Sequence, residues 1–174
     1  KIFFALLTRQ PVIFIGDKKY AVEQALSTLL TFYPCPSVCI WADTPINDCL
    51  LIGTHSKNLD YYDKEPALIV DLRTYKVKRG EKNEFCAQLI AETIRIGQKS
   101  SLLDAKIYFQ SKISSLFVIF RALLEISAIE KEKQPQEFQN LLANYPKANI
   151  HLILRMSNNL NSILGKKIQI YLNF

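Results

Sequence analysis

Two histidines, His55 and His151, are the only imidazole groups in the 174-residue chain that could act as a general base. Nucleophilic catalysis needs such a base beside a serine or cysteine that a tight turn exposes. The sequence contains no Gly-x-Ser-x-Gly elbow. His55 and Ser56 close an apolar run, where a histidine that satisfies a loop carbonyl is more common than a catalytic one. We therefore predict no catalytic residue.

A glycine follows the first apolar run, at Gly16, and the acidic Asp17 comes next. A helix that starts after such a turn can hold a phosphate group at its N-terminus. A dinucleotide fingerprint needs three spaced glycines, however, and a P-loop ends in Gly-Lys-Ser/Thr. Neither pattern occurs, so we predict a tight strand-to-helix turn with Asp17 as the helix cap, and no bound cofactor.

Four cysteines are spread along the chain without C-x-x-C spacing or a nearby pair of histidines, namely Cys35, Cys39, Cys49 and Cys86. A zinc site or a disulfide framework requires closer spacing or more cysteines than this. We expect no metal, and we expect reduced, buried thiols of the kind found in cytoplasmic proteins. Acidic pairs such as Asp60 and Asp63 lie in polar segments, where solvated carboxylates are the default.

The basic residues cluster once, at Arg73, Lys76, Lys78 and Arg79. On an alternating strand Lys76 and Lys78 point to one side, and charges there protect a sheet edge from unwanted pairing. The same charges also suit an acidic protein surface or lipid headgroups. With His55 and Ser56, which close an earlier apolar run, these four residues are our candidate partner-binding positions.

Composition limits the class of protein. Almost half of the residues, 49%, are hydrophobic and 22% are charged, so the chain can bury a core and is not disordered. The net charge of +6 is spread along the sequence, whereas nucleic-acid-binding modules concentrate it on one face, so we expect no nucleic-acid partner. The most apolar run, 113–120, lies between Lys112 and Arg121 and is too short for a transmembrane helix. The apolar N-terminus lacks an initiator methionine, so we expect an excerpt of a longer protein.

Hydrophobic periodicity divides the chain near Gly80. Short apolar runs before it predict strands over 11–16, 37–42, 50–54, 67–72 and 76–78, with one helix that ends at Pro34. After it, helical spacing predicts helices over 81–96, 101–133, 136–144 and 148–164 and a closing strand over 167–172. Gly97 is the expected stop of the first, and the second has a possible joint at 110–115. We expect an α/β fold with a mixed, mainly parallel sheet over about 11–80 and an all-helical C-terminal part, divided as 1–98 and 99–174.

The order of these runs resembles the DENN domain family. Pro11–Gly16 is similar to its strand of type P-V-I-F-x-G, and the helix that ends in Tyr33 and Pro34 is similar to its helix ending in Leu-x-Tyr-Pro. Leu50–Ser56 is similar to a strand reading F-L-I-G-x-H-S, and Ala67–Thr74 is similar to one reading V-V-D-L-x-T. The connection over 35–49 is shorter than is usual in the family, as in a minimal or folliculin-type member.

The resemblance implies that the chain binds a small GTPase of the Rab or Rag type and regulates its nucleotide state. Most such modules are guanine-nucleotide exchange factors in membrane trafficking or signalling, and they act through a surface rather than a catalytic side chain. It further implies a longin-type lobe or partner subunit, and a cytoplasmic location with peripheral recruitment to organelle membranes. Two alternatives stay open: a non-catalytic assembly scaffold, and an α/β enzyme with a pocket near Gly16, Asp17 and His55 at the strand ends.

Overall fold

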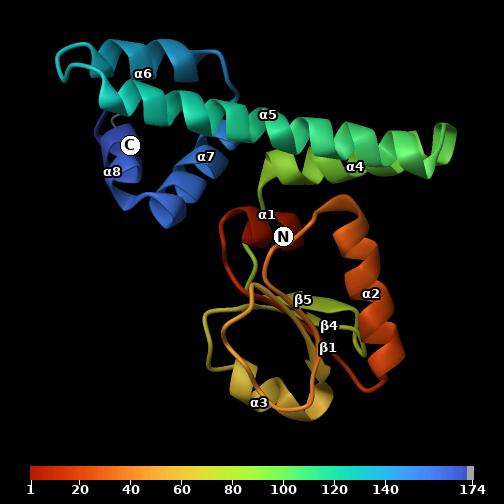
Figure 1. Cartoon of the computed structure of the whole chain (residues 1–174). Helices are drawn as coiled ribbons and strands as arrows, with labels where there is room; N and C mark the ends of the chain where they lie inside the picture. The colour runs from red at the N-terminus through yellow and green to blue at the C-terminus, as the bar shows by residue number, and fades with distance from the viewer. Residues whose placement is uncertain (172–174) are drawn as a thin grey trace. The chain divides into compact units, whose positions relative to one another are not determined.

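The computed structural model of the chain describes residues 1–171. The chain divides between Lys82 and Asn83 into two compact units, coloured from red to green and from green to blue in Figure 1. We call them the α/β unit and the helical unit, and we describe each by itself.

The α/β unit is built on a five-stranded sheet in the order β2-β3-β1-β4-β5. The first four of these strands are parallel, and β5 pairs antiparallel with β4. The expected mixed, mainly parallel sheet with flanking helices is therefore confirmed. In chain order the elements are α1 (Ile2–Leu7), β1 (Val12–Gly16), α2 (Lys19–Phe32), β2 (Val38–Ala42), β3 (Leu51–His55), a 3₁₀ turn (Ser56–Asn58), α3 (Leu59–Tyr62), β4 (Leu68–Asp71) and β5 (Lys76–Lys78).

Both faces of the sheet are covered, which explains why β1 reads as an uninterrupted apolar run. Val12 and Phe14 point to the face where α1 and α2 pack. Ile13 and Ile15 point to the opposite face, where Tyr62 of α3 packs. Figure 1 shows α2 and α3 on opposite sides of the strands.

Glycine at position 53 allows α2 to approach the middle of β3. A Cβ atom there would lie 2.7 Å from Leu26 Cδ1 and 2.8 Å from Val22 Cγ1, and it would also collide with the carbonyl oxygen of Ile40. Both aliphatic side chains belong to the buried face of α2. The glycine of the L-I-G segment is thus explained by close helix-to-strand packing.

The helical unit is arranged around one long helix, α5. It contains α4 (Glu84–Lys99), α5 (Leu102–Ala128), α6 (Gln134–Ala143), α7 (Lys147–Leu160) and α8 (Ser162–Tyr171). Helix α4 pairs with the N-terminal half of α5, while α6, α7 and α8 gather at its other half (Figure 1). The all-helical C-terminal part is confirmed.

The structure corrects two local predictions in this unit and decides between the two alternatives, one helix or two, for α5. Gly97 lies inside α4, which continues to Lys99, because the Gly97 backbone is helical and costs only about 1 kcal/mol relative to alanine. Helix α5 runs through 110–115 without a joint, and Ser101 caps it by accepting a hydrogen bond from Asp104 N at 3.0 Å. The strand expected over 167–172 is a helix up to Tyr171, and Leu172 lies outside the described residues.

Helix α5 is long and apolar enough to cross a membrane by length and composition. Its most apolar stretch has a mean hydropathy of 1.3, and 28% of that stretch is buried. The core helix of a soluble protein passes the same test, so the evidence for a span is weak. The prediction of no transmembrane segment stays a prediction.

Candidate functional site

The carboxyl ends of the parallel strands bring together several of the residues that the sequence singles out. Gly16 of β1 is in register with His55 of β3, and Ile15 of β1 is in register with Asp71 of β4. From β1 the chain passes to α2 on one face, and from β3 it passes to α3 on the other. Open parallel sheets bind ligands and partners at such a switch point.

Asp17 and Ser56 join the ends of β1 and β3. The Ser56 hydroxyl donates a hydrogen bond to Asp17 Oδ1. The prediction that Asp17 caps α2 is therefore wrong. The residue at the cap position is Lys18, whose side chain makes no hydrogen bond to the helix. The Asp17 carboxylate is directed toward Ser56 at the end of β3 instead.

His55 is fixed by the turn that follows it. Its Nδ1 accepts a hydrogen bond from the Lys57 backbone N–H at 3.0 Å, with Ser56 Oγ at 3.3 Å from the same nitrogen. An Nδ1 that accepts carries no proton, so the neutral ring is protonated at Nε2. Because Nδ1 is occupied by the backbone and the Ser56 hydroxyl donates to Asp17, the group orders a turn rather than activating a nucleophile.

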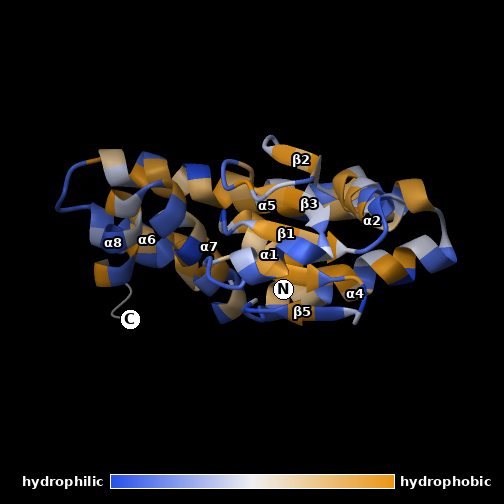
Figure 2. Cartoon of the chain, turned by 90° about the horizontal axis from the view of Figure 1, so that it is seen from below, coloured by the Kyte–Doolittle hydropathy of each residue, from blue (hydrophilic) through white to orange (hydrophobic). Residues whose placement is uncertain are grey.

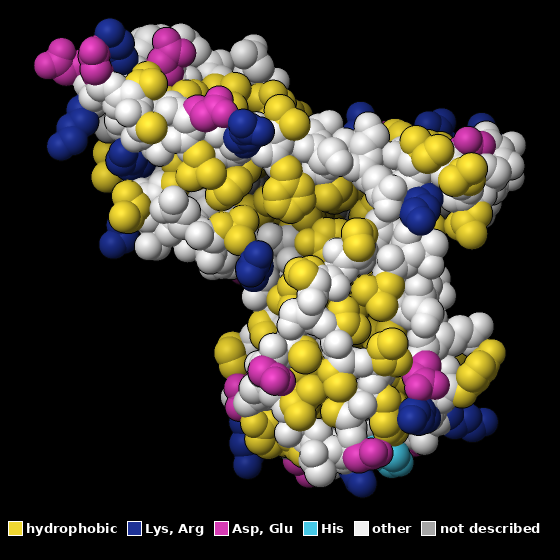
Figure 3. Space-filling model, in the orientation of Figure 1, with side chains coloured by type: hydrophobic (Ala, Val, Ile, Leu, Met, Phe, Trp, Pro, Cys, Tyr) yellow, Lys and Arg dark blue, Asp and Glu magenta, His cyan; other side chains and the backbone are white. Residues whose placement is uncertain are grey.

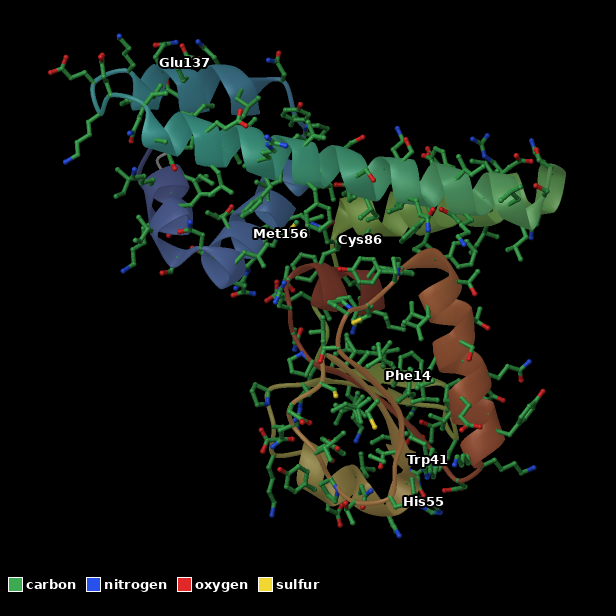
Figure 4. The ribbon with its side chains drawn as sticks, viewed as in Figure 1. Phe14, Trp41, His55, Cys86, Glu137 and Met156 are labelled. Carbon is green, nitrogen blue, oxygen red and sulfur yellow. The ribbon has the colours of Figure 1, made fainter. Side chains whose placement is uncertain are left out.

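Trp41 extends this group onto the end of β2. Its indole N–H donates to Asp43 Oδ1 at 2.8 Å, and its ring lies edge-on to His55 with centroids 6.3 Å apart. Lys19 Nζ lies 6.0 Å from the indole centroid. Figure 4 shows Trp41 and His55 next to each other at this end of the sheet. Sequence reasoning did not assign Trp41 to a site, although a lone tryptophan that closes an apolar run was an available signal.

A buried polar network fixes the chain between β2, β3 and α3. Asn58 Nδ2 donates to Thr54 Oγ1 at 2.7 Å and to the Asp43 carbonyl at 3.3 Å. Thr54 Oγ1 in turn donates to the Ala42 carbonyl at 2.7 Å. Satisfied buried networks of this kind rigidify the loops that they join, so the side chains at these strand ends stand on a fixed frame.

Arg73 forms a forked ion pair at the end of β4. Its Nε donates to Asp71 Oδ1 at 3.0 Å and its Nη2 to Asp71 Oδ2 at 2.9 Å, while its backbone N–H donates to the same carboxylate. The side-chain hydrogen bonds from Arg73 are the main reason that the pKa of Asp71 falls from 3.8 to about 2. The charge of Arg73 is thus balanced locally, although the guanidinium itself stays partly exposed.

The remaining predicted cations lie along β5. Lys78 Nζ is 3.5 Å from Asp63 Oδ2. Arg79 donates to the carbonyl oxygens of Tyr62, Asp63 and Glu65, and these bonds tie the end of β5 to the loop after α3. Lys76 is exposed and stands opposite Asp71 in register.

The structure therefore divides the six predicted positions. His55, Ser56 and Arg73 gather at the strand ends, and Lys76 stands beside them. Lys78 and Arg79 lie further along the sheet edge, where Arg79 has a structural task. We use the name strand-end cluster for Asp17, Trp41, His55, Ser56, Asp71, Arg73 and Lys76.

Within residues 1–171, no group of three or more histidine, cysteine, aspartate or glutamate side chains could hold a metal ion. A small cavity of about 80 Å³ lies under α3, between Pro11, Ile52, Tyr62 and Ala67. Pro11 and Ala67 directly precede β1 and β4, so the cavity lies toward the amino ends of the strands, away from the strand-end cluster. What the cluster offers is a rigid surface of charged and aromatic groups, which suits recognition of another macromolecule.

Comparison with known proteins adds no identification. No family model matches the chain, and no curated protein matches its sequence.

Proposed function

We propose that the chain is a DENN-like module that binds a small GTPase of the Rab or Rag type and regulates its nucleotide state, as an exchange factor or as a subunit of one. One observation carries the proposal. The segments that resemble the family lie on β1, β3 and β4, which are adjacent parallel strands, and on the end of α2. The carboxyl ends of the three strands lie side by side, whereas the Tyr33 end of α2 lies at their amino ends, with its ring edge-on to Phe3 of α1.

The chemistry of that edge supports binding rather than turnover. His55 and Ser56 are engaged in ordering a turn, and Arg73 is held by Asp71. Lys57 and Lys76 are exposed near the same edge. A fixed surface with projecting cations favours fast, oriented encounter with an acidic partner surface.

The test is release of a fluorescently labelled guanine nucleotide from a panel of Rab- and Rag-type GTPases. We expect the full chain to accelerate release from at least one of them. Lys76→Glu reverses an exposed charge at the strand-end cluster, so we expect it to reduce the acceleration at least fivefold. Lys131→Glu changes an exposed lysine of the helical unit and serves as the matched control, with no change expected.

A scaffold role is the second candidate, and one observation favours it. Large apolar side chains stand exposed along α5, as is typical of surfaces that bind other proteins. GTPase binding without any acceleration of nucleotide release, equal for the two nucleotide states, would support the scaffold over the exchange factor. A panel that shows neither binding nor acceleration would contradict the GTPase proposal.

A further inference from the structure

Helix α5 is apolar on two opposite faces. One face is buried in the helical unit and consists of Ala105, Phe109, Ile113, Leu116, Ile119 and Leu123. On the opposite face Leu103, Ile107 and Val118 are 64%, 56% and 68% exposed. Figure 2 shows apolar residues in the helices of this unit, and Figure 3 shows hydrophobic side chains at its surface.

Helical spacing places these exposed residues on one stripe. From Leu103 to Ile107, then to Ser114 and to Val118, the steps are four, seven and four residues, which return to the same side of a helix with 3.6 residues per turn. Ser111 lies three residues before Ser114, on the same side of the helix. We call Leu103, Ile107, Ser111, Ser114 and Val118 the outer face of α5.

The outer face is complementary to itself when two copies of α5 run antiparallel. The register that places Ile107 opposite Val118 of the second copy also places Ser111 opposite Ser114, as the sums of their residue numbers agree. Apolar residues then meet apolar residues toward the ends. The small serines meet at the centre, where they allow two helices to approach closely.

The same antiparallel register also brings residues of opposite charge together. Asp104 stands level with Arg121 of the second copy, and the two-fold axis repeats this pair at the other end. Arg121 is exposed, and its partner in its own chain is Glu125, four residues away on the same helix. Exposed pairs of this kind contribute little on their own, but they specify an antiparallel orientation over a parallel one.

We propose that the chain forms a two-fold dimer through the outer face of α5, with Ile107 packed against Val118 of the second copy. An isologous interface requires self-complementarity of this kind, which favours a second copy over an unrelated surface as the occupant. The inference is independent of the proposed GTPase function.

Sedimentation equilibrium of the full chain over a range of concentrations tests the dimer. We expect a monomer–dimer equilibrium in the wild type and at least a tenfold weaker one in Val118→Lys, with unchanged helical circular dichroism. Ile163→Lys replaces an apolar residue of α8 that is equally exposed, at 69%, and is the matched control with no expected effect. A wild type that stays monomeric at several hundred micromolar would overturn the proposal.

Exchanging the two charges tests the register. Asp104→Arg and Arg121→Asp should each weaken the dimer, and the double variant should recover most of the loss. The hydrogen bond that the Ser101 hydroxyl donates to the Asp104 carboxylate is lost in both Asp104→Arg and the double variant, so recovery reports the contact between copies. No recovery would contradict this register.

Flotation with lipid vesicles tests the other occupant of the outer face. Monomers that float with the vesicles, and lose this property in Val118→Lys, would assign the outer face to a membrane surface and overturn the dimer.

Discussion

The two units of the chain use their apolar residues in opposite ways. In the α/β unit β1 and β4 are buried along their whole length, and the outer edge at β5 carries Lys76 and Lys78. In the helical unit nine large apolar side chains stay exposed among the described residues, against four in the α/β unit. These nine are Ile94, Leu102, Leu103, Ile107, Phe117, Val118, Ile129, Ile163 and Ile170.

The polar chemistry is divided in the opposite sense. The hydrogen-bonded strand-end cluster belongs to the α/β unit, and its groups satisfy one another within that unit. The helical unit offers apolar surface and exposed charges instead. The contrast indicates two kinds of recognition: a rigid polar edge that suits a charged partner, and an apolar helix face that suits association of two copies.

The sharpest way to test the contrast is within α5 itself, because Phe109 is buried and Phe117 is 43% exposed. We expect Phe109→Ala to lower the free energy of unfolding by about 3 to 5 kcal/mol, since it removes a buried ring and leaves a cavity. Phe117→Ala should cost about 1 kcal/mol or less. Urea denaturation of both variants at a low concentration of chain measures the difference. Equal losses would show that the second face of α5 is covered within the molecule.

Two glycines extend the comparison to both units. Gly53→Ala should destabilise the α/β unit by about 3 kcal/mol, because its Cβ would meet a backbone oxygen and two buried side chains of α2. Gly97→Ala should stabilise the helical unit by about 1 kcal/mol, because Gly97 lies inside α4 and its Cβ would meet only Ala105 at 3.5 Å. Thermal unfolding of the two variants measures both effects, as a lower midpoint for Gly53→Ala and a higher midpoint for Gly97→Ala. A Gly53→Ala variant as stable as the wild type would contradict the close packing of α2 on β3.

A smaller effect concerns pH and is confined to the α/β unit. The pKa of Asp71 is about 2 in the folded chain, below its ordinary 3.8, so its stabilising effect is present above pH 4 and is lost as pH falls through 2. Asp71→Asn should flatten the dependence of stability on pH between about 4 and 2, with a lower unfolding midpoint at neutral pH. Chemical denaturation at a series of pH values measures it. A variant with the wild-type slope over that range would show that Arg73 does not stabilise the carboxylate.

The layout of the α/β unit could be predicted because each local signal agreed with the fold. Apolar runs of strand length mark β1, β3 and β4, and Pro34 follows the helix α2 that it was expected to end. In the helical unit the signals conflicted. Gly97 has the type of a helix stop but lies inside α4, and the alternation of 167–171 also fits a helix with Ile168 buried. Tertiary packing decided these cases, and a single sequence does not show it.

The candidate site was predictable in its parts and not in its pairings. His55 and Ser56 were named from the end of an apolar run and Arg73 from the basic cluster, and the structure places them at the carboxyl ends of β3 and β4, on either side of β1. The bond from Ser56 to Asp17 and the contact of Trp41 with His55 could not be foreseen, because they depend on the order of strands in the sheet. Arg79 was grouped with its neighbours by charge, yet its backbone φ of 60° turns it toward the loop after α3.

The most direct test of the account is the affinity of the full chain for a responsive GTPase in its nucleotide-free and nucleotide-bound forms, measured side by side by isothermal titration calorimetry. An exchange module stabilises the nucleotide-free state, so the account predicts at least tenfold tighter binding to that form. The preference should shrink in Lys76→Glu and persist in Lys131→Glu. Equal affinity for the two forms, or no binding across the panel, would contradict the central proposal.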